Sequence, residues 1–224
     1  MHEQALSEYL ESFLTDNRKR VINKVLENRT RYVTVVLEDI YQSQNASAIV
    51  RTCDCLGIQN IHIIEDRNKF VLNPDVIRGA DGWLDIQKHK NTQQSIDNLK
   101  QQGYRIIATS PHEGCVTPDN INLQNGKTAI IFGTESSGIT NIVKTCADEF
   151  LHIPMFGFTE SLNISVAAAI TLYSITNRLH SSTLDWQLTR KEIADIKLKW
   201  LLKTIKKSHL LEKRFTEEYN YQST

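Results

Sequence analysis

Three short polar or glycine-rich segments, each of which follows an apolar run, constrain the fold of this chain more than any other feature. They are residues 45–51 (Asn-Ala-Ser-Ala-Ile-Val-Arg), 133–138 (Gly-Thr-Glu-Ser-Ser-Gly) and 161–163 (Ser-Leu-Asn). The apolar runs predict β-strands. Because α/β folds bind ligands in loops at the ends of parallel strands, the three segments predict one site built from three loops.

Strands and helices alternate through the middle of the chain. Strand 32–37, helix 46–56 and strand 61–64 form a βαβ unit, which makes the two strands parallel. The pattern continues with strand 83–86, helix 92–102, strands 105–109 and 128–132, helix 139–147, strand 150–153 and helix 163–179. Gly57 and Gly103 are expected to end two of the helices. We therefore expect an α/β fold, with a mostly parallel sheet and helices on both faces.

Basic residues concentrate toward both ends of the chain, although its formal net charge is zero. Residues 18–31 hold six basic residues against one acidic residue, and residues 187–214 hold nine against three. Residues 3–29 are predicted to be helical, and residues 190–210 predict a helix with a lysine-rich side. Such ends favour contact with a polyanion, although solvated helix faces, or a basic helix for membranes or calmodulin, also account for the charge.

The length of 224 residues suits one domain with appendages. We expect a basic helical extension in residues 1–30, an α/β domain in residues 31–180 and a second basic helical extension in residues 181–224. Hydrophobic residues at 40% and charged residues at 23% are typical of a soluble globular protein.

Membrane and secreted proteins are disfavoured by the sequence. No apolar run approaches the roughly 18 residues of a membrane span. The polar, acidic start (Met-His-Glu-Gln-Ala-Leu-Ser-Glu) does not have the pattern of a signal peptide. The four cysteines form neither a disulfide framework nor a Cys-x-x-Cys metal pair. We expect a cytoplasmic protein without a metal site.

The polar residues of the first and third segments each have a simple structural interpretation. Asn45 stands at the predicted N-cap of helix 46–56, and Ser161 or Asn163 precedes the last long helix, where capping alone explains them. Arg51 lies about a turn and a half beyond Asn45, where a surface arginine is unremarkable. Only the ordered combination with the second segment favours a functional site.

The second segment, residues 133–138, has a glycine turn as its simple interpretation. It lacks the sequences of phosphate-binding loops, which disfavours a generic nucleotide-binding module. Its glycines allow backbone groups to approach a flat ligand such as adenine closely. Glu135 then places a carboxylate at the tip of the loop.

Taken in order, the three motifs within residues 31–178 resemble those of the SpoU/TrmH family of RNA 2′-O-methyltransferases, in the SPOUT superfamily. The resemblance implies an α/β-knot fold, in which the C-terminal part of the domain threads a loop to form a deep trefoil knot. It also implies S-adenosylmethionine as methyl donor, and a homodimer packed near the long helix 163–179. The loops that would hold the methyl donor carry Thr109, Gly133, Ile153 and Leu162.

The reaction implied is attack of a ribose 2′-hydroxyl on the sulfonium methyl group, without a metal ion. The resemblance assigns catalytic roles to Asn45, Arg51, Glu135, Ser161 and Asn163, and RNA contacts to Arg18, Arg20 and Gln44. Many relatives carry His where this chain has Gln44, which cannot accept the hydroxyl proton. We hypothesise that Arg51, which stays protonated, stabilises charge on the 2′ oxygen or grips a phosphate, while another group takes the proton.

The expected substrate is a guanosine in the D-loop of tRNA. Relatives that act on ribosomal RNA often carry a longer N-terminal RNA-binding domain, whereas the predicted helical ends here are short. The alternatives are an rRNA 2′-O-methyltransferase with the same chemistry and a non-catalytic RNA-binding protein.

Overall fold

The computed structural model describes residues 2–110, 115–134 and 137–222, the last four by their backbone only. The chain divides into two compact units, Thr30–Trp186 and Met1–Arg29 with Gln187–Thr224.

The first unit is built on a six-stranded sheet in which every neighbouring pair of strands is parallel. The strand order is β3-β2-β1-β5-β4-β6. The strands are β1 (Val33–Glu38), β2 (Asn60–Ile64), β3 (Asp85–His89), β4 (Arg105–Thr109), β5 (Thr128–Phe132) and β6 (Glu149–Leu151). The helices are α3 (Ser43–Cys55), α4 (Pro74–Ile77), α5 (Thr92–Gln101), α6 (Asn141–Cys146) and α7 (Ile164–His180), with short 3-10 turns η1 (Ala80–Trp83) and η2 (Leu123–Asn125).

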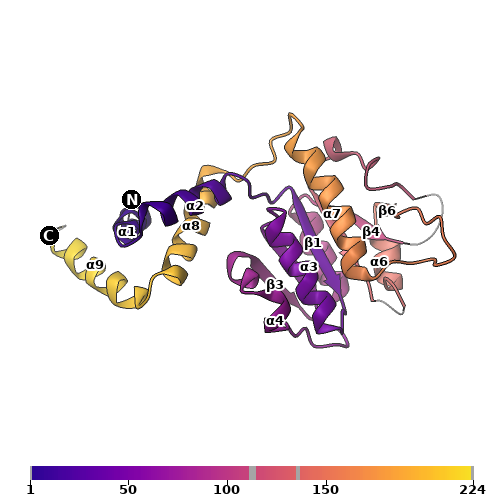
Figure 1. Cartoon of the computed structure of the whole chain (residues 1–224), viewed down its shortest axis with the longest axis horizontal. Coiled ribbons are helices and arrows are strands. Elements are labelled where there is room, and N and C mark those ends of the chain that lie inside the picture. Colours follow the sequence, from indigo (N-terminus) through magenta and orange to yellow (C-terminus); the bar gives the residue numbers. More distant parts are fainter. Residues whose placement is uncertain (1, 111–114, 135–136, 223–224) are drawn as a thin grey trace. The chain divides into compact units, whose positions relative to one another are not determined.

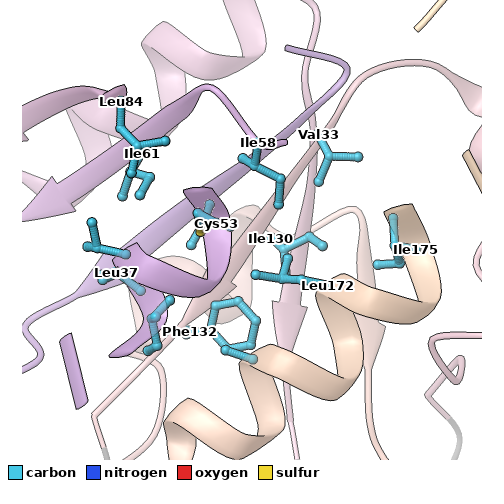
Figure 2. Close-up of a cluster of buried hydrophobic side chains, with 14 of the residues drawn as sticks. Val33, Leu37, Cys53, Ile58, Ile61, Leu84, Ile130, Phe132, Leu172 and Ile175 are labelled. Carbon is cyan, nitrogen blue, oxygen red and sulfur yellow. The ribbon is translucent and has the colours of Figure 1, made fainter. Parts of the chain in front are cut away.

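Helices cover both faces of this sheet, as the alternation of side chains along β1 requires. Val35 and Leu37 lie in a core cluster with residues of α3 and α7. Val36, between them, points to the other face and joins a cluster with residues of α5 and α6. Figure 2 shows the first cluster, with Cys53 of α3 and Leu172 of α7 packed on the strands. The predicted α/β class and parallel sheet are confirmed.

In this unit, the predicted strand 83–86 and the predicted helix 46–56 have different bounds in the structure. The predicted strand 83–86 is wrong in its bounds: residues 80–83 form η1, and β3 continues to His89 by pairing with β2. Gln87 and Lys88 are exposed on this edge strand, where polar residues protect a sheet edge and remove the apolar signal. The helix predicted from residue 46 begins at Ser43, so Asn45 is not its N-cap.

The segment between β4 and β5 lies against later parts of the chain. Val116 bridges Leu151, so β6 has β4 on one side and this segment on the other. The Arg178 guanidinium of α7 donates hydrogen bonds to the carbonyl oxygens of Pro118 (2.8 Å) and Ile121 (2.7 Å). Residues 116–121 therefore contact both β6 and α7, which follow them in the chain.

The second unit consists of four helices: α1 (His2–Glu11), α2 (Asp16–Leu26), α8 (Arg190–Thr204) and α9 (Ser208–Gln222). Residues 3–29, predicted to be helical, form two helices, because the Thr15 hydroxyl caps the second one by accepting a hydrogen bond from the Arg18 backbone N–H. The helix predicted over residues 190–210 is also two, with Lys207 in a left-handed conformation between them. Leu10, Leu26 and Trp200 are buried in this unit.

In the described part of the chain, no helix combines the length and the apolar character needed to cross a membrane.

Candidate functional site

The three sequence motifs begin at one edge of the sheet. Because all strands are parallel, the carboxyl ends of β1, β5, β4 and β6 lie on the same edge. The first motif lies in α3 after β1, residues 133–138 follow β5, and residues 161–163 lie between β6 and α7. Figure 1 shows α3 and α7 side by side over the sheet, in agreement with their packing. This arrangement agrees with the site edge expected for a parallel α/β fold.

Asn45 and Asn163 join the first and third motifs. Asn45 is buried in the first turn of α3, and its amide Nδ2 donates to Gln42 Oε1 at 2.7 Å. Its Oδ1 accepts a hydrogen bond of 3.1 Å from Nδ2 of Asn163. Residues 118 positions apart in sequence are therefore held together by their side chains.

Asn163 also caps α7, so its simple structural interpretation is correct as well. Its Oδ1 accepts from the backbone N–H of Ser165 at 2.9 Å and from the Ser165 hydroxyl at 2.6 Å. One amide thus sets the start of α7 with its oxygen and holds Asn45 with its nitrogen. Ser161 and Leu162 precede it in an exposed segment.

Arg51 lies away from this amide pair. It lies six positions after Asn45 along α3, which is about 9 Å of helix rise. Its side chain is exposed, and Nη1 donates to the Val76 carbonyl oxygen at 3.3 Å. It borders an apolar surface hollow of about 410 Å³ between α3, α4 and α7, whose lining includes Ala169 and Tyr173. The structure therefore leaves the guanidinium accessible to a ligand.

The described ends of segment 133–138 form a tight closed turn. Thr134 and Gly138 exchange two backbone hydrogen bonds, of 2.9 and 3.0 Å. A Cβ on Gly133 would lie 2.3 Å from the carbonyl carbon and oxygen of Gly138, so no other residue fits without moving the backbone. Gly138 has φ +66°, a conformation that also favours glycine. Glu135 lies outside the described residues.

The remaining predicted residues are placed as follows. Thr109 ends β4, and its hydroxyl donates to the Ile131 carbonyl oxygen at 3.0 Å. Ile153 follows β6 and is half-buried, and Gln44 is exposed in the first turn of α3. Arg18 and Arg20 lie on α2 in the other unit.

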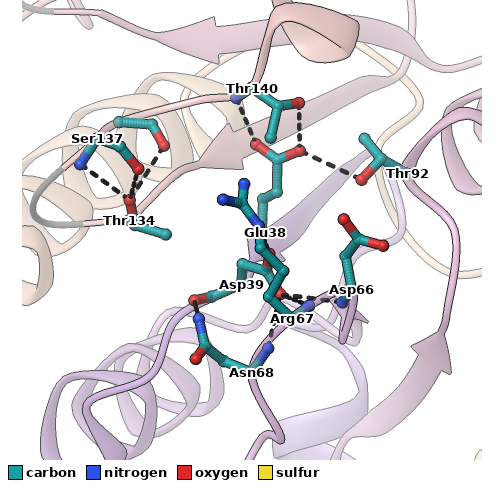
Figure 3. Close-up of polar contacts among 10 residues, drawn as sticks. Glu38, Asp39, Asp66, Arg67, Asn68, Thr92, Thr134, Ser137 and Thr140 are labelled. Atoms are coloured by element: carbon teal, nitrogen blue, oxygen red, sulfur yellow. Dashed lines mark hydrogen bonds and ion pairs between the residues drawn. The ribbon is translucent and has the colours of Figure 1, made fainter.

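Sequence reasoning missed two buried carboxylates, Glu38 and Asp39, at the end of β1 (Figure 3). Their only signal in the sequence is an acidic pair directly after an apolar strand. Their hydrogen bonds reach residues far along the chain, which no local pattern reveals.

Comparison with known proteins gives consistent matches. The profile of the SpoU rRNA Methylase family matches residues 32–173. A protein of Borreliella burgdorferi named tRNA (guanosine(18)-2'-O)-methyltransferase is 46% identical over 203 residues, covering 91% of this chain and 93% of that protein. A protein of Thermus thermophilus with the same name is 32% identical, covering 84% of this chain and 98% of that protein.

Two solved structures extend these matches. The Aquifex aeolicus TrmH/SpoU tRNA modifying enzyme has a TM-score of 0.75 and 30% identity, covering 86% of this chain and 98% of that one. The SpoU methyltransferase AviRb of Streptomyces viridochromogenes, solved in complex with AdoMet, has a TM-score of 0.61 and 22% identity, covering 71% and 62%. The second likeness shows the shared fold.

Proposed function

Because this chain belongs to the SpoU rRNA Methylase family, we propose that it methylates the ribose 2′-hydroxyl of guanosine(18) in the tRNA D-loop. The observation that carries this proposal is the 46% identity over 91% of the chain to a relative named for that reaction. The match of 203 residues extends well beyond residues 32–173, so it includes terminal sequence as well as the methyltransferase domain. That extent favours the tRNA substrate over ribosomal RNA.

S-adenosylmethionine, when bound, supplies an electrophilic methyl group on its sulfonium. In this proposal its adenine lies among Thr109, the ends of segment 133–138 and residues 153–162. Within the described part of the chain, no backbone–backbone hydrogen bond involves residues 153–162, which supports their proposed role as partners of a ligand. Gly133 and Leu162 would contribute backbone groups of this kind, and Ile153 an apolar wall.

We propose that Arg51 contributes more to catalysis than the other residues of the site. Its guanidinium is exposed, and arginine side chains stay protonated in proteins. It therefore acts by stabilising negative charge that develops on the 2′ oxygen, or by holding a neighbouring phosphate, rather than by accepting the proton. The planar fork of donors suits a phosphate better than the single ammonium of lysine does.

The amide pair has a positioning role in this proposal. The Asn45–Asn163 hydrogen bond fixes the start of α7 against α3, so the third motif keeps a set position relative to the helix that carries Arg51. Ser161 and Glu135 complete the polar residues that orient the ribose. Gln44, exposed beside Asn45, would contact RNA.

The terminal unit is proposed to bind RNA through phosphate contacts. Arg20 is exposed on α2, and α8 and α9 expose several lysines. Such contacts provide affinity and orientation with little base specificity, which suits an enzyme that selects one position through the shape of its tRNA. Arg18 is half-buried and is proposed to contribute beside Arg20.

Two further properties of the family are proposed for this chain. The contacts of residues 116–121 with β6 and α7 support a trefoil knot, with the segment between β4 and β5 as the loop that is threaded. A homodimer is supported by an exposed apolar stripe on α7, where Val166 (45% exposed), Ile170 (43%) and Tyr173 (63%) recur at helical spacing.

The test is methyl incorporation from labelled S-adenosylmethionine into total tRNA and into ribosomal RNA, followed by mapping of the modified nucleotide. We expect label at the D-loop guanosine with the natural protein and a loss of at least a hundredfold with Arg51→Ala. Lys127→Ala is the matched control, because Lys127 is an exposed cation at the opposite, amino-terminal edge of the sheet. Label in ribosomal RNA alone would indicate ribosomal RNA, and not tRNA, as the substrate. RNA binding without any label would favour a non-catalytic RNA-binding protein.

A further inference from the structure

Glu38, the last residue of β1, is a buried carboxylate that binds the start of another element. Its side chain is 1% exposed. One oxygen accepts from the backbone N–H of Thr140 at 3.0 Å, and the other accepts from the Thr140 hydroxyl at 2.7 Å and the Thr92 hydroxyl at 3.3 Å (Figure 3). A carboxylate is costly to bury unless such donors surround it. The three hydrogen bonds therefore offset the cost of burying the Glu38 carboxylate, and all three donors lose their acceptor if it is removed.

Thr140 marks the far end of the glycine-rich loop. It is the N-cap of α6 and comes two residues after Gly138. The near end of the loop follows Phe132, which pairs with Leu37 in the register of β1 and β5. Both ends of the loop are thus attached to consecutive residues of β1, one through strand pairing and the other through the Glu38 side chain.

The neighbouring carboxylate offers a comparison within the same strand end. Asp39 is 2% exposed and has a left-handed backbone, with φ 56°. Its Oδ1 accepts from the backbone N–H groups of Asp66 (2.9 Å), Arg67 (2.8 Å) and Asn68 (3.2 Å), in the loop after β2 (Figure 3). Adjacent buried carboxylates therefore hold two different loops, and only the loop held by Glu38 belongs to the candidate site.

We propose that Glu38 is a positioning residue that fixes the described ends of the glycine-rich loop, residues 133–134 and 137–140, in the shape required by the methyl donor. This inference rests on the proposed function, since it takes that segment as part of the S-adenosylmethionine site. Without the carboxylate, the Thr140 N–H and hydroxyl lose their acceptor and the far end of the loop is released. The loop must then be ordered when the ligand binds, and the cost of ordering weakens the affinity.

The variants that test this are Glu38→Ala, Glu38→Gln and the control Asp39→Ala. Amide hydrogen exchange of the free protein reports the order of residues 133–140 directly. Calorimetry gives the Kd for S-adenosylmethionine, and steady-state kinetics gives KM for tRNA. We expect Glu38→Ala to speed exchange across residues 133–140 and to raise the Kd at least tenfold, with KM for tRNA changed less than twofold. Glu38→Gln keeps one acceptor oxygen and should fall between the natural protein and Glu38→Ala.

Asp39→Ala removes an equally buried carboxylate, so it controls for general loss of stability. We expect it to speed exchange near residues 66–68 and to leave both the Kd and the exchange of residues 133–140 within twofold. Unchanged exchange of residues 133–140 in Glu38→Ala, or an equal rise in Kd for Asp39→Ala, would overturn the inference. A natural protein that binds no S-adenosylmethionine would instead overturn the proposed function, while the exchange data would still decide whether Glu38 holds the loop. If Glu38→Ala fails to fold, Glu38→Gln carries the same comparison.

Discussion

Replacing Gly133 by alanine tests how tightly the glycine-rich loop is built. The added Cβ would lie 2.3 Å from the carbonyl carbon and oxygen of Gly138 and 2.4 Å from the Ile139 nitrogen. Optimal separations between such atoms are about 3.5–4.0 Å, so the backbone has to move by roughly 1 Å or more. Overpacking of this kind costs about 1–3 kcal/mol, and separation of the Thr134–Gly138 pair would lose two hydrogen bonds of about 1 kcal/mol each.

We therefore expect Gly133→Ala to lower the free energy of unfolding by about 3–5 kcal/mol. For a chain of this size that corresponds to a fall in Tm of about 6–20 °C. Urea denaturation measures the first quantity and calorimetry the second. Because the added Cβ displaces the ends of this loop, the Kd for S-adenosylmethionine should rise even where the global stability loss is smaller.

Two other glycines distinguish steric overlap from backbone strain as the cause of a loss of stability. Gly138 has open space around an added Cβ but a φ of +66°, so Gly138→Ala should cost about 1 kcal/mol through backbone strain alone. Gly157 has neither a close neighbour nor a positive φ, so Gly157→Ala should leave stability unchanged or slightly raised. A Gly133→Ala protein that is as stable as Gly157→Ala, and that binds S-adenosylmethionine as well as the natural protein does, would refute the tight packing of this loop.

Three further changes follow from the structure. Asn163→Ala removes the N-cap of α7 and should lower the free energy of unfolding, measured by urea denaturation, by about 1 kcal/mol. Asn163→Asp keeps the cap but loses the donor to Asn45, so the rate of methyl transfer should fall with little loss of stability. Ile170→Glu places a charge in the exposed stripe of α7 and should give monomers in light scattering, whereas a dimer that persists would contradict the proposed interface. Burial and the neighbouring His89 lower the pKa of His62 from 6.5 to about 4, so the folded state favours the neutral ring. The contribution of neutral His62 to the free energy of unfolding is complete above pH 6.5. It should fall by about 2 kcal/mol at pH 5 and continue to fall as the pH drops through 4. His62→Gln should make the free energy of unfolding depend less on pH over this range.

Local sequence was sufficient for much of the central fold. The strands β4 and β5 have the predicted bounds, because each is a short apolar run between turn residues. Gly57 and Gly103 follow α3 and α5 with φ values of 77° and 83°, as expected of residues that end helices. The meeting of three motifs at one edge also followed from the sequence, because alternating strands and helices require a parallel sheet.

Tertiary structure decided what depends on partners distant in the chain. Asn45 lies in the first turn of α3, and its amide binds Asn163, a partner that its neighbours in the sequence do not reveal. Polar β3 is a strand only because β2 lies beside it. The role of Glu38 also depends on a distant partner. Its buried carboxylate is stabilised by Thr140, 102 residues later in the chain, and this donor can be recognised only in the folded structure.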